Sequence, residues 1–126
     1  EMQIKKTGKL FSFCCMAPVI ISKKYHFIKK FEKIGFDIGL LFQIADDLID
    51  YSGKTKNVGK KTKKDLKKGK ATLISLLGYK NTIKYANKIK LIVFKRLDLF
   101  GKKAEDLKNT INYILERSKW IKNINI

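Results

Sequence analysis

The sequence has very little proline and cysteine and no long apolar stretch. Pro18 is the only proline, and 44% of the residues are hydrophobic, which favours a helical globular protein over a disordered one. The 126 residues are enough for one core and too few for two ordinary domains. The longest apolar run, residues 13–21, is too short to cross a bilayer, so no integral membrane segment is expected.

Cysteine and histidine are too few, and too poorly spaced, for a zinc site. Cys14 and Cys15 are adjacent, and neighbours on a helix point about 100° apart, so a disulfide between them is not expected. Their place in an apolar run predicts reduced, buried thiols, which are typical of a cytoplasmic protein. His26 has no partner in the sequence, and we interpret it as a surface residue rather than a catalytic base.

Arginine is also scarce, although the chain carries a formal charge of +18. Only Arg96 and Arg117 are arginines among the 29 Lys and Arg residues. A phosphate-rich partner, such as nucleic acid, anionic lipid or a diphosphate, would explain the charge. The alternative is codon bias in an AT-rich genome, because Ile and Asn are abundant as well. Since nucleic-acid binders usually recruit arginine for bidentate contacts, we favour codon bias as the source of most of the charge.

Apolar residues recur with helical spacing along the chain. Residues 4–14 predict a first helix that ends near Pro18, and Ser22 is expected to cap the next one. That second helix is predicted from about Phe27 to Tyr51, roughly 40 Å in length. Residues 52–69 contain three glycines and many lysines, so we expect a basic loop there.

Shorter helices are predicted after this loop. They cover residues 71–77, 83–97 and 104–114, with Gly78 and Gly101 as stops after the first two. No segment shows the sustained alternation of apolar and polar residues that marks a strand. The predicted fold class is therefore all-α, with short links between antiparallel neighbours.

An acidic segment near the end of the long predicted helix is the strongest chemical signal. Asp46, Asp47 and Asp50 fall within five residues, and Asp46 and Asp50 lie one turn apart on one face. Gln43 shares this stripe. Like charges near the negative end of a helix dipole cost stability, and a divalent cation removes that cost.

Magnesium suits this segment because it prefers oxygen ligands and usually bridges one or two carboxylates to phosphate oxygens. The acids therefore indicate Mg²⁺ holding a phosphorylated ligand, and the alternative is a solvated acidic face. An EF-hand is excluded because its loop pattern of acids and glycine is missing. Gly35 and Gly39 continue the stripe away from the acids and leave it without side-chain bulk.

Lysines follow the acidic segment directly. Gly59-Lys60-Lys61, Lys64-Asp65-Leu66 and Gly69-Lys70-Ala71-Thr72 lie on the predicted loop, from which a lysine can fold back over a metal-bound phosphate. The alternative is a solvated loop. We expect that alternative for the remaining lysines of the segment, which are Lys54, Lys56, Lys67 and Lys68.

In this order, the motifs resemble those of the trans-isoprenyl diphosphate synthases. Residues 42–50, Phe-Gln-x-x-Asp-Asp-x-x-Asp, resemble the second aspartate-rich motif of that family, and the lysine blocks resemble the segment that follows it. Lys6-Thr7-Gly8 upstream and Tyr113-Ile114-x-x-Arg117 downstream also match. The resemblance covers nearly the whole chain and is greatest to the bacterial-type farnesyl and geranylgeranyl diphosphate synthases. It implies the C-terminal half of the isoprenoid synthase helical bundle.

The resemblance also implies a cofactor and a substrate site. Mg²⁺ bridging an allylic diphosphate would be bound by Asp46, Asp47 and Asp50, with Asp46 the most direct ligand. The diphosphate would be contacted by Lys6, Lys60 and, more weakly, Lys70.

Catalytic roles follow from the same resemblance. The Thr7 hydroxyl and the Gln43 amide would lie near the carbon that becomes cationic, and Lys6 would stabilise the departing diphosphate. Isopentenyl diphosphate would attack the resulting allylic cation, so catalysis would be mainly electrostatic stabilisation of the leaving group. A complete enzyme of this kind is expected to be a cytoplasmic homodimer that does not bind nucleic acid.

One part of the family pattern is missing. The family needs two facing aspartate-rich motifs, and residues 1–126 contain only one. We therefore expect a partial polyprenyl synthase domain, the C-terminal half without the N-terminal half, that is inactive alone. The start at Glu1 rather than at a methionine agrees with this expectation.

Two other functions remain open. A basic helical protein that binds nucleic acid or anionic membrane would explain the charge, but the acidic segment would repel phosphate unless a metal is present. A terpene cyclase or head-to-head condensing enzyme would share the helical fold, but the lysine blocks favour the chain-elongating branch.

Overall fold

The structure is a computed structural model that describes residues 2–56 and 72–124, with the side chains of residues 5–53 and 72–117. These residues form helices and no strand, which confirms the predicted all-α fold class. The elements in chain order are α1 (Met2–Ile21), η1 (Tyr25–Phe27), α2 (Ile28–Lys56), α4 (Leu73–Leu77), α5 (Tyr79–Leu97), η3 (Asp98–Ala104) and α6 (Glu105–Ile124).

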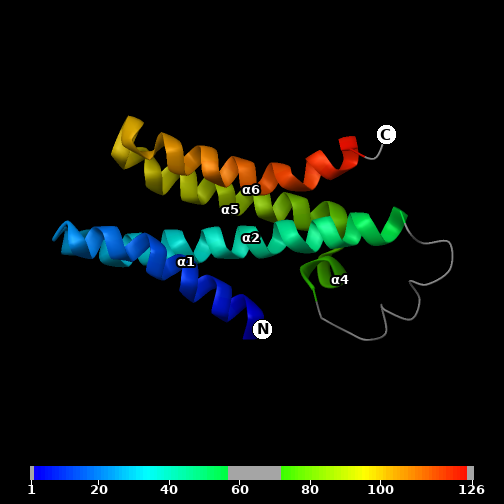
Figure 1. Cartoon of the computed structure of the whole chain (residues 1–126), viewed down its shortest axis with the longest axis horizontal. Coiled ribbons are helices and arrows are strands. Elements are labelled where there is room, and N and C mark those ends of the chain that lie inside the picture. Colours follow the sequence, from blue (N-terminus) through cyan, green and yellow to red (C-terminus); the bar gives the residue numbers. More distant parts are fainter. Residues whose placement is uncertain (1, 57–71, 125–126) are drawn as a thin grey trace.

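Helix α2 is the longest element and lies at the centre of the arrangement. Its 29 residues span about 43 Å at 1.5 Å per residue. Figure 1 shows α1 along one side of α2 and the pair α5 and α6 along the other, and α2 contacts all three. Helices α5 and α6 run antiparallel to each other, so the C-terminal part of α6 lies beside the second half of α2 (Figure 1).

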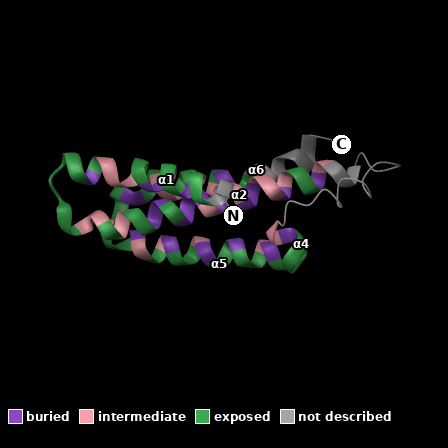
Figure 2. Cartoon of the chain, turned by 90° about the horizontal axis from the view of Figure 1, so that it is seen from below, coloured by how far each residue is buried: buried purple, intermediate pink, exposed green. Residues whose placement is uncertain are grey.

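The core lies where α2 faces α5 and α6, and the buried positions line these inner faces (Figure 2). The spacing of three and four residues gives each helix one apolar stripe. The stripes consist of Ile34, Ile38, Leu41, Ile44, Ala45 and Leu48 on α2, Ala86, Ile89, Val93 and Leu97 on α5, and Ile111 and Ile114 on α6.

Glycines bring the backbones of α1 and α2 into direct contact. A Cβ atom on Gly35 would lie 2.5 Å from the carbonyl oxygen of Phe11, and one on Gly39 would lie 3.1 Å from the Cα of Gly8. The buried Ser12 hydroxyl donates to the carbonyl of Glu32 at 3.0 Å across the same contact. The stripe at Gly35 and Gly39, which lacks side-chain bulk as predicted, is therefore covered by α1.

The boundaries of the first two helices differ from the prediction. Helix α1 continues through Pro18 to Ile21. The predicted N-cap role of Ser22 is wrong, because its hydroxyl donates to the carbonyl of Pro18 at 2.8 Å and so closes the end of α1. Helix α2 continues to Lys56, so the predicted loop is wrong for residues 52–56, while residues 57–69 lie outside the described residues.

The three later helices are confirmed, with shifted ends. The Thr72 hydroxyl caps α4 by accepting from the backbone N–H of Ser75 at 3.2 Å. Helix α5 begins at Tyr79, directly after Gly78, and α6 extends to Ile124. Between them, Gly101 has φ 55° and ψ −133°, a conformation that strongly favours glycine. The turn packs back onto α2 through Phe100, whose ring centroid lies 5.3 Å from that of Phe31.

The two cysteines have different surroundings. Cys14 is exposed, so its predicted burial is wrong, whereas Cys15 is half-buried against the core. Burial, and to a smaller degree the neighbouring Cys14, raises the pKa of the Cys15 thiol above its usual value. Both thiols are free, and His26 is exposed as predicted.

Among residues 2–56 and 72–124, none of the helices combines the length and the hydropathy that a bilayer crossing demands.

Candidate functional site

The acidic segment lies on the second half of α2, beyond the contact with α1. Asp46 and Asp47 are half-buried, and Asp50 is exposed. The described part of the chain contains no group of three or more His, Cys, Asp or Glu side chains that could hold a metal ion. An ion at this face would therefore need further ligands from phosphate, water or other side chains. The assignment of the three aspartates as metal ligands stays a prediction.

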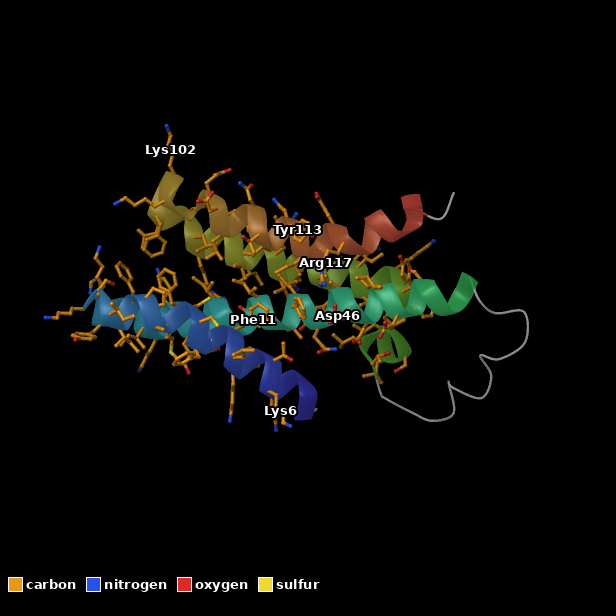
Figure 3. All side chains as sticks on the ribbon, in the orientation of Figure 1. Lys6, Phe11, Asp46, Lys102, Tyr113 and Arg117 are labelled. Atoms are coloured by element: carbon orange, nitrogen blue, oxygen red, sulfur yellow. The ribbon has the colours of Figure 1, made fainter. Side chains whose placement is uncertain are left out.

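Asp46 is held by an arginine from the last helix. The Nη2 atom of Arg117 donates to Asp46 Oδ1 at 3.1 Å, and the two side chains point toward each other between α6 and α2 (Figure 3). The Arg117 guanidinium carbon lies 4.6 Å from the centroid of the Phe42 ring, one turn before Asp46. Phe42 in turn packs on Phe11 of α1, with ring centroids 5.4 Å apart. Side chains of α1, α2 and α6 thus form a continuous series of contacts that ends at Asp46.

Gln43 lies beside the second aspartate. Its Nε2 atom donates to Asp47 Oδ1 at 3.4 Å, which is long for a hydrogen bond. Both side chains are half-buried on the same helix. The structure therefore places Gln43 with the acids, as the helical spacing predicted, and its predicted place near a reacting carbon stays a prediction.

Lys6 and Thr7 lie on α1, close to the point where α1 crosses α2. A Cβ atom on Gly39 would lie 3.2 Å from the carbonyl oxygen of Thr7, one turn before Gln43 on α2. Thr7 is half-buried there, and Lys6 is exposed. In the view of Figure 3, the Lys6 side chain extends away from α2. The predicted contact of Lys6 with a diphosphate stays a prediction.

The predicted basic half of the site falls on residues 57–71, which lie outside the described residues. Lys60 and Lys70 belong to this segment, together with the Lys64-Asp65-Leu66 block. Their roles as diphosphate ligands stay predictions.

Sequence reasoning missed two interhelical pairs. Arg117 was matched only as part of a final helix, and its contact with Asp46 spans 71 positions of the chain. Asp37 was not singled out, yet it is buried and paired with Arg96 of α5 at 2.7 Å and with Lys33 at 2.8 Å. The available signal was the scarcity of arginine, because a planar guanidinium forms a geometrically defined pair that lysine cannot reproduce.

The donor atoms on this face fit the ion that the sequence predicts. Mg²⁺ takes hard oxygen ligands, and it is commonly bound by one or two carboxylates together with substrate phosphates. Within the described residues, no hydrogen bond or ion pair involves Asp46 Oδ2 or the Asp50 carboxylate. These oxygens, and those of Asp47, are the ones that would hold the ion.

Comparison with known protein families gives a match over most of the chain. The profile of the polyprenyl synthetase family matches residues 1–114 of the chain. No solved structure gives a significant match.

Individual relatives match over most of the chain. A farnesyl diphosphate synthase of Micrococcus luteus is 34% identical, over 94% of this chain and 41% of its own length. A dimethylallyltranstransferase of Fischerella ambigua is 32% identical, over 90% of this chain and 33% of its own. A geranylgeranyl diphosphate synthase of Cyanophora paradoxa is 30% identical, over 93% of this chain and 39% of its own. The chain thus spans about two fifths or less of these relatives, and it belongs to the polyprenyl synthetase family.

Proposed function

We propose that these residues form one side of a prenyl transfer site, and that the whole protein condenses isopentenyl diphosphate with an allylic diphosphate. Family membership supports the reaction class, and the names of relatives support farnesyl or geranylgeranyl diphosphate as product. The observation that carries the proposal is the acidic segment on α2. Its half-buried Asp46 accepts a hydrogen bond from Arg117 through Oδ1, and Oδ2 remains available to bind a metal ion.

The reaction requires the allylic carbon–oxygen bond to break, with its electron pair leaving on the diphosphate. Bound Mg²⁺ would supply positive charge to that leaving group. Asp46, Asp47 and Asp50 would hold that ion through their carboxylates, and Lys6 would add positive charge near the diphosphate from α1. Lys60 and Lys70 would do the same from the segment after α2.

Residues near the reacting carbon would stabilise the cation that remains. The Thr7 hydroxyl and the Gln43 amide are neutral polar groups whose oxygen atoms can point toward a cation and stabilise it without forming a covalent bond to it. Isopentenyl diphosphate would then attack this carbon with the electrons of its double bond. A proton lost from the new cation completes the product, and departing diphosphate is a suitable acceptor for it.

The 126 residues are proposed to be incomplete for this reaction. The sequence contains one aspartate-rich motif, and the relatives named above are at least twice as long. A facing acidic motif and the isopentenyl diphosphate site would come from polypeptide outside these residues. The chain alone should therefore bind an allylic diphosphate and fail to elongate it. A cytoplasmic location and a homodimeric assembly are proposed on the family resemblance, and free thiols at Cys14 and Cys15 agree with a reducing compartment.

The test is calorimetric titration of the chain with dimethylallyl diphosphate, with Mg²⁺ and again with EDTA. Binding should require Mg²⁺ and weaken about 10- to 100-fold in Asp46→Ala, because a ligand of the ion is removed. Glu32→Ala is the matched control, since it removes an exposed carboxylate from the other end of α2. Binding that ignores EDTA and instead falls steeply with salt would indicate simple polybasic attraction and reject the proposal.

A further inference from the structure

The Arg117 side chain contacts three groups, namely a carboxylate, an aromatic ring and a backbone carbonyl. Nη2 donates to Asp46 Oδ1 at 3.1 Å, the guanidinium carbon lies 4.6 Å from the Phe42 ring centroid, and Nε donates weakly to the carbonyl of Ile114 at 3.4 Å. A planar cation can stack on a ring and donate in its own plane at the same time, which an ammonium cannot do. The position of Nη2 is therefore defined by the ring beneath it as well as by the carboxylate.

The contact with Asp46 uses one carboxylate oxygen only. Arginine commonly binds a carboxylate through two parallel hydrogen bonds, which would engage both oxygens. Here Oδ2 has no partner within the described residues, and 41% of the Asp46 side chain is exposed. The arginine thus orients the carboxylate through Oδ1 and leaves Oδ2 available for a further ligand.

This geometry matters because Asp46 has like-charged neighbours on its own helix. Asp47 and Asp50 repel it, and repulsion alone would turn the Asp46 side chain away from them. The contact with Arg117 of α6 defines where Asp46 Oδ1 lies, and with it the direction of Oδ2. Partners that orient metal ligands in this way commonly change affinity when they are removed.

We propose that Arg117 is the positioning residue for Asp46, holding Oδ1 so that Oδ2 is directed to a divalent cation that carries a diphosphate. Because Arg117 comes from α6, the docking of the last helix on α2 becomes a condition for loading the site. This inference rests on the proposed function, since it assigns the loaded ion to Asp46.

The experiment measures binding of inorganic pyrophosphate to the full chain by calorimetry, with Mg²⁺ and with EDTA. Arg117→Met should weaken Mg²⁺-dependent binding about 10- to 100-fold. Lys108→Met is the matched control on the same helix, because it also removes a cation paired with an aspartate, at 2.6 Å from Asp98. It should leave pyrophosphate affinity unchanged.

Two further variants test whether Arg117 positions Asp46 or only adds positive charge near the bound pyrophosphate. Arg117→Lys keeps the positive charge and loses the planar guanidinium that stacks on the Phe42 ring. If Arg117 positions Asp46, the pyrophosphate affinity of this variant should lie between those of wild type and Arg117→Met. In an Asp46→Asn background, Arg117→Met should add little, because the group that it positions is already altered. Wild-type affinity in Arg117→Lys, or losses that add fully in the double variant, would overturn the inference.

The outcomes for the inference and for the proposed function are distinct. Wild-type affinity in Arg117→Met, together with lost binding in Asp46→Asn, would overturn the role of Arg117 and leave the prenyl transfer site standing. Binding of pyrophosphate to wild type that is equal with Mg²⁺ and with EDTA would overturn both. Circular dichroism of each variant verifies that the helices are intact before binding is compared.

Discussion

Two arginine–aspartate pairs fasten α2 to its neighbours, and their surroundings differ. In the first half of α2, Asp37 is 9% exposed and has both oxygens engaged, one by Arg96 at 2.7 Å and one by Lys33 at 2.8 Å. In the second half, Asp46 is 41% exposed and has one oxygen engaged, by Arg117 at 3.1 Å. The first carboxylate is satisfied by protein groups alone, and the second keeps capacity for a ligand from outside.

The two halves differ in packing as well. The first half contacts α1 backbone to backbone at Gly35 and Gly39, whereas a Cβ atom on Gly53, near the end of α2, would meet nothing within 4 Å. On α2, the polar and glycine contacts that stabilise the fold therefore lie in the first half, and the carboxylate available for a ligand lies in the second half. Substitutions at Gly35 and at the Asp37 pair should change the free energy of unfolding, whereas those at the Asp46 pair should mainly change ligand affinity.

The largest effect on stability is expected from Arg96→Met. Among the described residues it leaves the buried Asp37 carboxylate with Lys33 as its only cationic partner, and it should lower the free energy of unfolding by about 3 kcal/mol. Urea denaturation followed by circular dichroism measures this loss. Lys33→Ala is the control and should cost about 0.5 kcal/mol, because that lysine is 56% exposed. Equal losses from the two variants would contradict the structural role of Arg96.

Gly35→Ala should cause the second-largest loss in the free energy of unfolding. Its methyl group would lie 2.5 Å from the Phe11 carbonyl oxygen, so α1 has to move away from α2, at a cost of about 2 kcal/mol. Gly53→Ala on the same helix adds the same methyl group in open space, and should raise stability by about 0.5 kcal/mol through helix propensity. Thermal denaturation of the two variants would show opposite shifts. A destabilised Gly53→Ala would reject the contrast between the two halves.

Asp46→Asn should change stability by less than about 1 kcal/mol, since its ion pair is partly exposed and the substitution relieves repulsion from Asp47 and Asp50. The same urea titration as for Arg96→Met gives the comparison directly. A loss of stability as large as that of Arg96→Met would show that the Arg117–Asp46 pair stabilises the fold as much as the Arg96–Asp37 pair does.

The smallest effect is a difference in thiol reactivity on α1. The thiolate is the form that alkylates, and burial raises the pKa of Cys15, so a smaller fraction of Cys15 is reactive at a given pH. Iodoacetamide should modify the exposed Cys14 first, with Cys15 reacting as the pH rises further. Mass spectrometry of Cys14→Ser and Cys15→Ser gives the two rates separately. Equal rates would show that α1 does not stay docked on the first half of α2.

Local patterns predicted the helices and part of the site. Apolar spacing located each described helix, and the density of charge at Asp46, Asp47 and Asp50 marked the acidic face. The end of α2 was missed because residues 52–56 have no apolar repeat, although the helix continues to Lys56. Asp37 was not singled out, because its partner Arg96 is 59 positions away in the sequence. The contact of Arg117 required knowledge of how α6 crosses α2, which periodicity does not contain.

The glycine contact between α1 and α2 has a mechanical consequence. At Gly8, Gly35 and Gly39 the backbones of α1 and α2 are in direct contact, and main-chain atoms cannot change rotamer to make room. Helix α1 therefore cannot shift relative to α2 without breaking this contact. Thr7 and Gln43 therefore travel as parts of one rigid unit. Helix α6 contacts the same region through the long Arg117 side chain, so a movement of α6 away from α2 would break the contact between Arg117 and Asp46. Any widening of the site must come from the α6 side, while the α1 side keeps its spacing.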